Sequence, residues 1–202
     1  LKDCEMDRKK PAAVPPQPAA VRKGPSVRTI TAVNRIKIIS MGSGGCGKSC
    51  LIKRYCEDRF VNKYIATIGV DYGVKPIQLE GNDVRVNFWD FSGHSEFFEI
   101  RNEFYKDAQG CLLVYDVGNR DSFNDCDAWL AEAAKFGANP NDMPITLCAN
   151  KIDKKRTVTE DEGRNFASSR GLHYFELSAS SGQNVNEMFD FLFSTVYKRV
   201  AT

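Results

Sequence analysis

Residues 42–49 read Gly-Ser-Gly-Gly-Cys-Gly-Lys-Ser, and this stretch decides the fold. The apolar run 36–41 before it is typical of a buried strand, and residues 50–55 after it are typical of the start of a helix. A strand, a glycine-rich turn ending in Lys-Ser, and a helix form the context of a phosphate-binding loop. Glycines let successive backbone N–H groups point at one anion, and the helix N-terminus adds its dipole. The sequence therefore predicts binding of a nucleoside triphosphate.

Each position of the phosphate-binding loop has an expected role. Lys48 is predicted to reach the β- and γ-phosphates, and the Ser49 hydroxyl is predicted to ligate Mg²⁺. A glycine-rich surface turn is the simpler alternative, but the flanking strand and helix argue against it. For Cys46, we favour a small side chain packed beneath the loop over a reactive thiol. The other residues expected to surround the phosphates are Gly42, Ser43, Gly44, Gly45, Gly47 and Cys50.

A second motif identifies the base. Asn150-Lys151-Ile152-Asp153 follows another apolar run at 144–149. The Asp153 carboxylate can accept hydrogen bonds from the N1–H and N2–H₂ groups of guanine. Adenine lacks these donors, so the carboxylate would stay unsatisfied at a cost of about 1.5–3 kcal/mol or more. We expect Asn150 to hold the loop and Lys151 to lie over the base.

A third motif, Ser178-Ala179-Ser180, follows the strand-like run 174–177, and its backbone N–H groups can donate to guanine O6. An Asn-Lys-x-Asp match alone could be an ordinary polar turn, but three loops in register make that interpretation weak. A kinase for a small substrate would also use a phosphate-binding loop, yet it leaves the other two motifs without a role. We therefore predict GTP and GDP as the ligands.

With these motifs, the chain resembles the small GTPases of the Ras superfamily over about residues 35–199. The resemblance implies that Thr67 ligates Mg²⁺ when the γ-phosphate is present and that Asp90 holds Mg²⁺ through water. It also implies that Phe60 packs across the guanine and that the N–H of Gly93 meets the γ-phosphate. The implied catalytic residues are Lys48, Thr67, Gly93 and His94.

Within the superfamily, the run 68–72 and the Trp89-Asp90 pair resemble Rab proteins. Residues 90–95, together with the runs 101–107 and 127–132, resemble most the Rab-like subfamily associated with J domains. A J domain needs a His-Pro-Asp loop, which these 202 residues do not contain. Tyr72, Trp89 and Tyr105 occupy the positions where Rab proteins place an aromatic triad that reports the nucleotide state to effectors. Ordinary aromatic core packing explains the same three residues equally well.

One departure from the Rab pattern affects the chemistry. Rab proteins carry Asp-Thr-Ala-Gly-Gln-Glu in switch II, whereas residues 90–95 read Asp-Phe-Ser-Gly-His-Ser. His94 thus replaces the glutamine that orients the attacking water, and a neutral imidazole offers one donor and one acceptor on a shorter ring. We expect a GTP-hydrolysing switch with a slow intrinsic rate. The alternatives are a GTP-loaded binding module that barely hydrolyses, and a histidine with no catalytic role.

The composition limits the remaining functions. The net charge is +2, and no basic cluster is interleaved with aromatic residues, so we expect no nucleic-acid surface. Seven cysteines without zinc-ligand spacing indicate reduced thiols and a cytoplasmic location, with the nucleus as the alternative. The last cysteine is Cys148, so we expect no prenyl anchor in this sequence. The expected partners are effectors, an exchange factor and an activating protein, all acting on a monomer.

The pattern along the chain predicts the architecture. Residues 1–34 are rich in proline and alanine and are predicted to be a disordered arm, whereas residues 35–200 form the GTPase domain. Strands are expected near 36–41, 70–78, 84–90, 110–116, 144–149 and 174–177, and helices after 49, from 121 to 129, after 159 and over 185–197. This alternation indicates an α/β fold of three layers, with helices on both faces of a six-stranded, mostly parallel sheet.

Overall fold

The computed structural model describes residues 34–139 and 141–200, so the predicted arm, apart from Asn34, lies outside the described residues. Its six-stranded sheet has the order β2-β3-β1-β4-β5-β6, and only the pairing of β2 with β3 is antiparallel among the described strands. The strands are β1 (Asn34–Met41), β2 (Val70–Leu79), β3 (Asn82–Phe91), β4 (Gly110–Asp116), β5 (Ile145–Asn150) and β6 (His173–Leu177).

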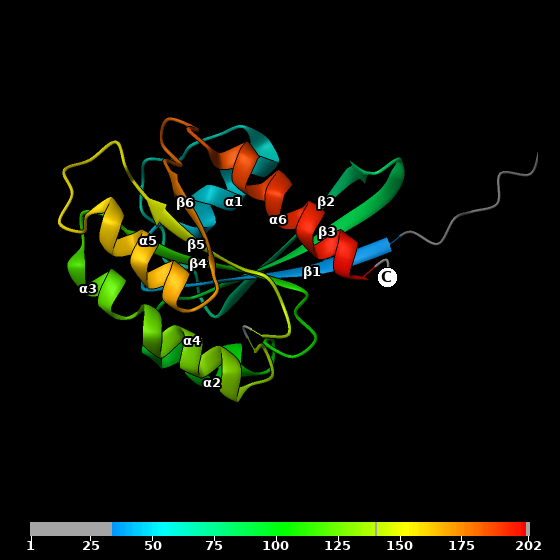
Figure 1. Ribbon diagram of the computed structural model, residues 1–202, viewed down its shortest axis with the longest axis horizontal. Coiled ribbons are helices and arrows are strands. Elements are labelled where there is room, and N and C mark those ends of the chain that lie inside the picture. The colour runs from blue at the N-terminus through cyan, green and yellow to red at the C-terminus, as the bar shows by residue number, and fades with distance from the viewer. Residues whose placement is uncertain (1–33, 140, 201–202) are drawn as a thin grey trace, which may run out of the picture. The chain divides into compact units, whose positions relative to one another are not determined.

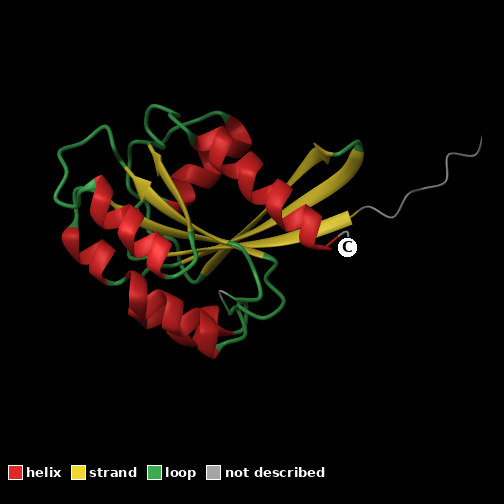
Figure 2. Cartoon of the chain, in the orientation of Figure 1, coloured by secondary structure: helices red, strands yellow, loops and turns green. Residues whose placement is uncertain are grey.

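Helices cover both faces of this sheet (Figures 1 and 2). They are α1 (Lys48–Glu57), α2 (Phe98–Asn102), α3 (Arg120–Asn124), α4 (Cys126–Lys135), α5 (Glu160–Ser169) and α6 (Val185–Val200), with a 3₁₀ turn η1 at Ser95–Phe97. On one face, Leu51 of α1 and Phe189 of α6 share a core with Phe88 of β3. On the other face, Trp129 of α4 shares a core with Leu113 of β4. The predicted three-layer fold is confirmed.

The apolar stripe of the last helix is buried, as its spacing predicts. All seven of its predicted positions are at most 6% exposed: Val185, Met188, Phe189, Leu192, Phe193, Val196 and Tyr197. The predicted start of α5 is also observed, because Thr159 and Glu162 form a capping box in which the Thr159 N–H donates to a Glu162 carboxylate oxygen at 2.8 Å. Local sequence signals therefore define both helices.

The helix predicted over 121–129 is instead two helices. Asn119 caps α3 through its side-chain oxygen, which accepts from the Asp121 N–H at 3.0 Å. Asp125 then separates α3 from α4, because its φ of −71° and ψ of −13° are closer to a 3₁₀ turn than to an α-helix. The second helix continues to Lys135, six residues beyond the predicted end at Trp129.

The parallel strands bring the sequence motifs to one edge of the sheet. The loops that follow β1, β3, β5 and β6 contain residues 42–47, 92–94, 151–153 and 178–180, respectively. The carboxyl ends of parallel strands are where α/β folds place their ligands. Among the described residues, no helix combines the length and apolar character needed to span a membrane.

Candidate nucleotide-binding site

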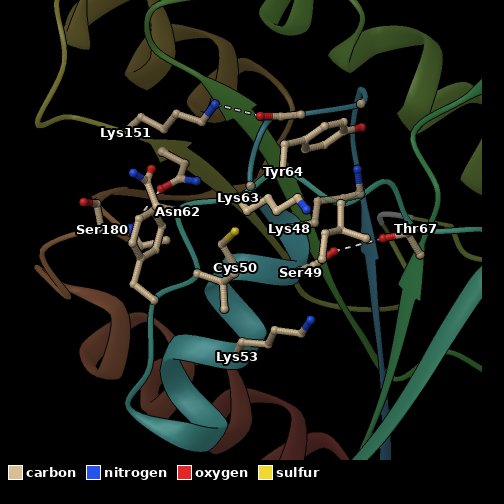
Figure 3. A pocket seen from close by; sticks show the side chains of 18 of the residues that line it. Lys48, Ser49, Cys50, Lys53, Asn62, Lys63, Tyr64, Thr67, Lys151 and Ser180 are labelled. Carbon is tan, nitrogen blue, oxygen red and sulfur yellow. Dashed lines mark hydrogen bonds between the residues drawn. The ribbon is translucent and has the colours of Figure 1, made fainter.

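A cavity of about 490 Å³ lies at this edge, and most of the predicted site residues line it. In Figure 3, Lys48, Ser49 and Thr67 lie toward one end of the cavity, and Lys151 and Ser180 lie toward the other. The predicted residues in the wall are Gly44, Gly45, Gly47, Lys48, Ser49, Cys50, Phe60, Thr67, Gly93, His94, Asn150, Lys151, Asp153, Ala179 and Ser180. Outside the wall are Gly42, Ser43, Cys46, Asp90 and Ser178.

The phosphate-binding loop requires glycine where its backbone meets other backbone or buried groups. Gly42 has a φ of 137°, and a Cβ there would lie 2.2 Å from the carbonyl oxygen of Val114. The loop curls around Lys48, whose Nζ donates to the Gly42 carbonyl at 2.6 Å and to the Ser43 carbonyl at 3.2 Å. Cys46 is buried, and burial raises the pKa of its thiol, which agrees with the expected packing beneath the loop.

Oxygen atoms gather at the phosphate end of the cavity. The Ser49 and Thr67 hydroxyl oxygens are 3.0 Å apart, and Ser49 also donates to the Asp90 carboxylate. Asp90 accepts a second hydrogen bond from Ser40 at 2.6 Å, and its burial raises the pKa of the carboxyl. One carboxylate and two hydroxyls fit Mg²⁺, which binds oxygen ligands and takes its remaining ligands from phosphates and water.

Asn150 joins the phosphate-binding loop to the loop after β6. Its side chain is buried at the end of β5 and donates from Nδ2 to the Cys46 carbonyl at 2.8 Å. Its Oδ1 accepts from the Ala179 N–H at 3.1 Å. Gly47 is required beside it, because a Cβ there would lie 2.3 Å from Asn150 Nδ2. The three sequence motifs therefore form one connected structure around the cavity.

Lys151 has a partner that the motifs did not reveal. Its Nζ donates to the Gly45 carbonyl at 2.7 Å and also lies 2.7 Å from the Asp116 carboxylate. Asp116 is the last residue of β4. An acidic residue where a strand meets a loop is ordinary, so the sequence alone does not identify Asp116 as the partner of Lys151. The pair fixes the Lys151 side chain along the cavity wall.

The third motif is organised differently from the prediction. The Ser178 N–H donates to the Gln183 carbonyl at 3.1 Å, and Ser178 lies outside the cavity wall, so its amide does not face a ligand there. Its hydroxyl instead donates to Asp153 Oδ1 at 2.6 Å and orients that carboxylate. Ala179 and Ser180 remain in the wall. Arg54 of α1 holds this loop by donating to both of their carbonyls, at 3.0 and 2.7 Å.

His94 lies over the glycines of the phosphate-binding loop. A Cβ at Gly44 would lie 3.1 Å from its Cε1 and 3.2 Å from its Nε2. The hydroxyl oxygen of Tyr64, in the segment between α1 and β2, is 3.2 Å from the same Nε2. Tyr64 was not predicted as a site residue, because an exposed loop tyrosine carries no motif. Both side chains line the cavity, and His94 lies beside Gly44.

The aromatic triad contains Phe104 rather than the predicted Tyr105. Tyr72 and Trp89 have ring centroids 4.7 Å apart, and Trp89 stacks on Phe104 at 4.9 Å. Tyr105 is fully buried on the other side of the chain, where it packs edge-on against Phe91 at 4.9 Å. Phe104 and Tyr105 follow α2, and their rings pack on different partners, Trp89 and Phe91. The sequence alone does not show which of two adjacent aromatic residues packs on Trp89.

Comparisons with known proteins agree with this arrangement. The Ras family model matches residues 37–198. "DnaJ homolog subfamily C member 27" of Danio rerio is 54% identical over 167 residues, which are 80% of this chain and 61% of that protein. The protein of the same name from Homo sapiens is 53% identical with the same coverage. "DnaJ homolog subfamily C member 27-B" of Xenopus laevis is 53% identical over 170 residues, or 80% and 62% of the two chains.

The chain thus spans about three-fifths of the length of these relatives. The match covers the Ras-like region, and it confirms the resemblance to Rab-like proteins associated with J domains. The family model covers most of the chain, including every loop that borders the cavity. Together with the sheet order and the glycine-rich loop, this match shows that the chain belongs to the Ras family.

Proposed function

We propose that the chain binds GTP and GDP with Mg²⁺ and acts as a nucleotide-dependent switch whose intrinsic hydrolysis is slow. The observation that carries this proposal is the position of Asn150. Its two side-chain hydrogen bonds join the phosphate-binding loop at Cys46 to the base-binding loop at Ala179 across one cavity. A structural role alone does not explain why Lys48, Lys151 and Asp153 also line that cavity.

Guanine is the base that the opposite end of the cavity favours. Asp153 faces the cavity, and the Ser178 hydroxyl holds one of its oxygens, so the carboxylate is oriented before a ligand binds. It would accept from N1–H and N2–H₂ of guanine, while the N–H of Ser180, which also lines the cavity, would serve O6. Phe60 and the stem of Lys151, which also line the cavity, would cover the faces of the base.

The phosphates would occupy the end formed by the glycine-rich loop. Lys48 and the loop N–H groups would neutralise the β- and γ-phosphates, and the Gly93 N–H would meet the γ-phosphate. Ser49 and Thr67 would hold Mg²⁺ directly, and Asp90 would hold it through water. When bound, Mg²⁺ supplies charge neutralisation to the transferring group. Ordering of switch I and switch II would then depend on the γ-phosphate.

Slow hydrolysis follows from the position of His94. The attacking water must be held in line with the γ-phosphate, and the imidazole is already engaged with the Tyr64 hydroxyl at 3.2 Å. The surface above Gly45 stays open, because a Cβ there would meet nothing within 4 Å. An arginine from an activating partner could enter there, and such a residue typically contributes about 10³–10⁵ in rate.

Single-turnover GTP hydrolysis at neutral pH tests this proposal. We expect His94→Gln to hydrolyse about 10- to 100-fold faster than the wild type, because the carbonyl and amide of glutamine reach farther than the shorter imidazole ring and can hold the water in line. His173→Gln, which changes the other histidine of the chain on β6, is the matched control and should leave the rate unchanged. An unchanged rate in His94→Gln would make His94 a bystander, and a slower rate would show that histidine positions the water better than glutamine.

The binding-module alternative predicts a different result, in which neither variant turns over GTP measurably although GTP stays bound. The nucleotide released from the purified protein by denaturation distinguishes the two directly: GDP supports the hydrolysing switch, and GTP supports the binding module.

We also propose that effectors contact the Tyr72, Trp89 and Phe104 surface, that an exchange factor loads the monomer, and that the protein acts in the cytoplasm. Exposed side chains of Ile68 and Tyr72, at 81% and 51%, support a protein-binding surface there.

A further inference from the structure

Arg54, in the last turn of α1, contacts the loop after β6 but does not line the nucleotide cavity. Its Nε donates to the Ala179 carbonyl at 3.0 Å, and its Nη2 donates to the Ser180 carbonyl at 2.7 Å. These two nitrogens form one edge of the planar guanidinium, so a single side chain holds two successive carbonyls. The side chain is only 18% exposed, and hydrogen bonds from a charged donor are stronger than neutral ones. Arg54 therefore fixes the backbone of this loop.

The ion pair of Arg54 is a simpler explanation for its position, but it is a weak one. Arg54 Nη1 lies 3.5 Å from a carboxylate oxygen of Asp58, the residue that ends α1, and donates to the Asp58 carbonyl at 3.2 Å. The Asp58 side chain is 98% exposed, and exposed pairs of this kind contribute little to stability. The other two guanidinium nitrogens both donate to the loop after β6. These loop contacts therefore account for the orientation of the guanidinium.

The same contact sets the direction of one backbone N–H. The Ala179 carbonyl and the Ser180 N–H belong to one peptide unit, which is planar and trans. In such a unit the C=O and N–H bonds point in opposite directions. Because the carbonyl points toward Arg54, the Ser180 N–H points away from it, and Ser180 lines the cavity (Figure 3). This N–H is the group proposed to serve O6 of guanine.

Ala179 is held from two sides before any base binds. Its N–H donates to Asn150 Oδ1 at 3.1 Å, and its carbonyl accepts from Arg54 Nε at 3.0 Å. The two partners come from different elements, because Asn150 ends β5 and Arg54 lies on α1. A site that is already oriented loses less conformational freedom when its ligand binds. Arg54 thus supplies half of the support for this peptide.

We propose that Arg54 is a positioning residue for guanine, which orients the Ser180 N–H toward O6 and so sets the selectivity for the group at position 6 of the purine. The inference rests on the proposed GTP/GDP function. Adenine carries an amino group at that position, and this donor would face the N–H instead of accepting from it. Because α1 begins at Lys48 and Ser49, one helix serves the phosphates with its first turn and the base with its last.

Binding of GDP, 6-thio-GDP and IDP to the full chain tests this inference. 6-Thio-GDP keeps N1–H and N2–H₂ but replaces O6 by sulfur, a weak acceptor, whereas IDP keeps O6 and lacks N2–H₂. We expect the wild type to bind GDP about 3- to 10-fold more tightly than 6-thio-GDP. In Arg54→Lys, which keeps the charge but loses the fork, this ratio should fall below about twofold. The ratio of GDP to IDP affinity reports Asp153 and should stay within about twofold of the wild-type value.

Asp58→Asn is the matched control. It removes the ion pair of Arg54 and leaves both loop contacts, and asparagine tolerates the positive φ of 49° at this position. Both affinity ratios should keep their wild-type values. If Arg54→Lys does not fold, Arg54→Met keeps an apolar stem, removes every donor and should lower the ratio of GDP to 6-thio-GDP affinity in the same way.

An Arg54→Lys variant that keeps the wild-type ratio of GDP to 6-thio-GDP affinity would overturn the inference. An equal fall of both ratios would also overturn it, because a general loosening would affect Asp153, which Ser178 of the same loop holds. The same holds if Asp58→Asn reproduces the loss, or if the wild type binds GDP and 6-thio-GDP equally. A wild type that binds ADP as tightly as GDP would instead contradict the proposed function, so the two failures are distinguishable.

Discussion

Replacing Gly93 by alanine tests how closely switch II must approach the phosphate-binding loop. A Cβ at Gly93 would lie 2.3 Å from Gly44 N, 2.4 Å from the Ser43 carbonyl carbon and 2.7 Å from the Gly42 carbonyl oxygen. All three atoms are backbone and cannot rotate away. The gap must therefore widen by about 1 Å to reach an ordinary contact distance of about 3.5 Å. We expect switch II to move off the loop and the proposed N–H contact with the γ-phosphate to be lost.

A hydrogen bond to a charged group contributes about 1.5–3 kcal/mol, so GTP affinity should fall by roughly 10- to 150-fold. GDP has no γ-phosphate, so its affinity should change by less than about twofold. Competition of GTP and GDP against a fluorescent GDP measures both affinities. Gly73→Ala is the control, because a Cβ on Gly73 would meet nothing within 4 Å. An equal loss for the two nucleotides, or no loss for GTP, would refute the reasoning.

Three further changes test other parts of the molecule. Asp153→Asn should shift preference from guanine toward xanthine nucleotides by about 2–3 kcal/mol in competition binding, and a wild type that binds ATP as tightly as GTP would contradict the base assignment. Ser49→Asn should abolish the Mg²⁺ dependence of GTP affinity; equal GTP binding by this variant and the wild type, with and without EDTA, would exclude Ser49 as a ligand. Gly163→Ala would place a Cβ 2.5 Å from the Tyr115 hydroxyl oxygen, and overpacking should exceed the helix-propensity gain and lower the free energy of unfolding by about 1 kcal/mol. Urea unfolding measures that change, and a stabilised variant would show that the tyrosine ring moves aside.

The elements with strong local signals were predictable. The strand and helix around residues 42–49 follow from a motif that needs that context, and α6 follows from the periodic spacing of its seven apolar positions. The sheet edge then brings Asn150, Asp153 and Ala179 to the same cavity as Lys48. For these parts, residue type and spacing carry enough information.

The remaining site contacts depend on long-range geometry. Arg101 and Glu132 form an ion pair, with Nε and Oε1 2.6 Å apart, although they are 31 positions apart in the sequence. Helical arginines and glutamates usually face solvent, so the residue types do not predict that this pair is buried. Asp116 and Lys151 pair between the ends of two strands that lie side by side only in the folded sheet. Phe104 takes the place in the aromatic triad that was predicted for Tyr105, because the direction of each ring depends on how the chain leaves α2.

The amide of Asn150 has a thermodynamic consequence. Because the same side chain bonds both Cys46 and Ala179, a ligand that orders one loop also partly orders the other. The second loop then loses less conformational entropy when its own ligand binds. Guanosine and inorganic pyrophosphate, added as separate molecules, should therefore bind with positive cooperativity, and each should raise the affinity of the other by the same factor. An exchange factor that distorts only the phosphate end would, by the same reciprocity, also weaken the hold on the base that it never touches.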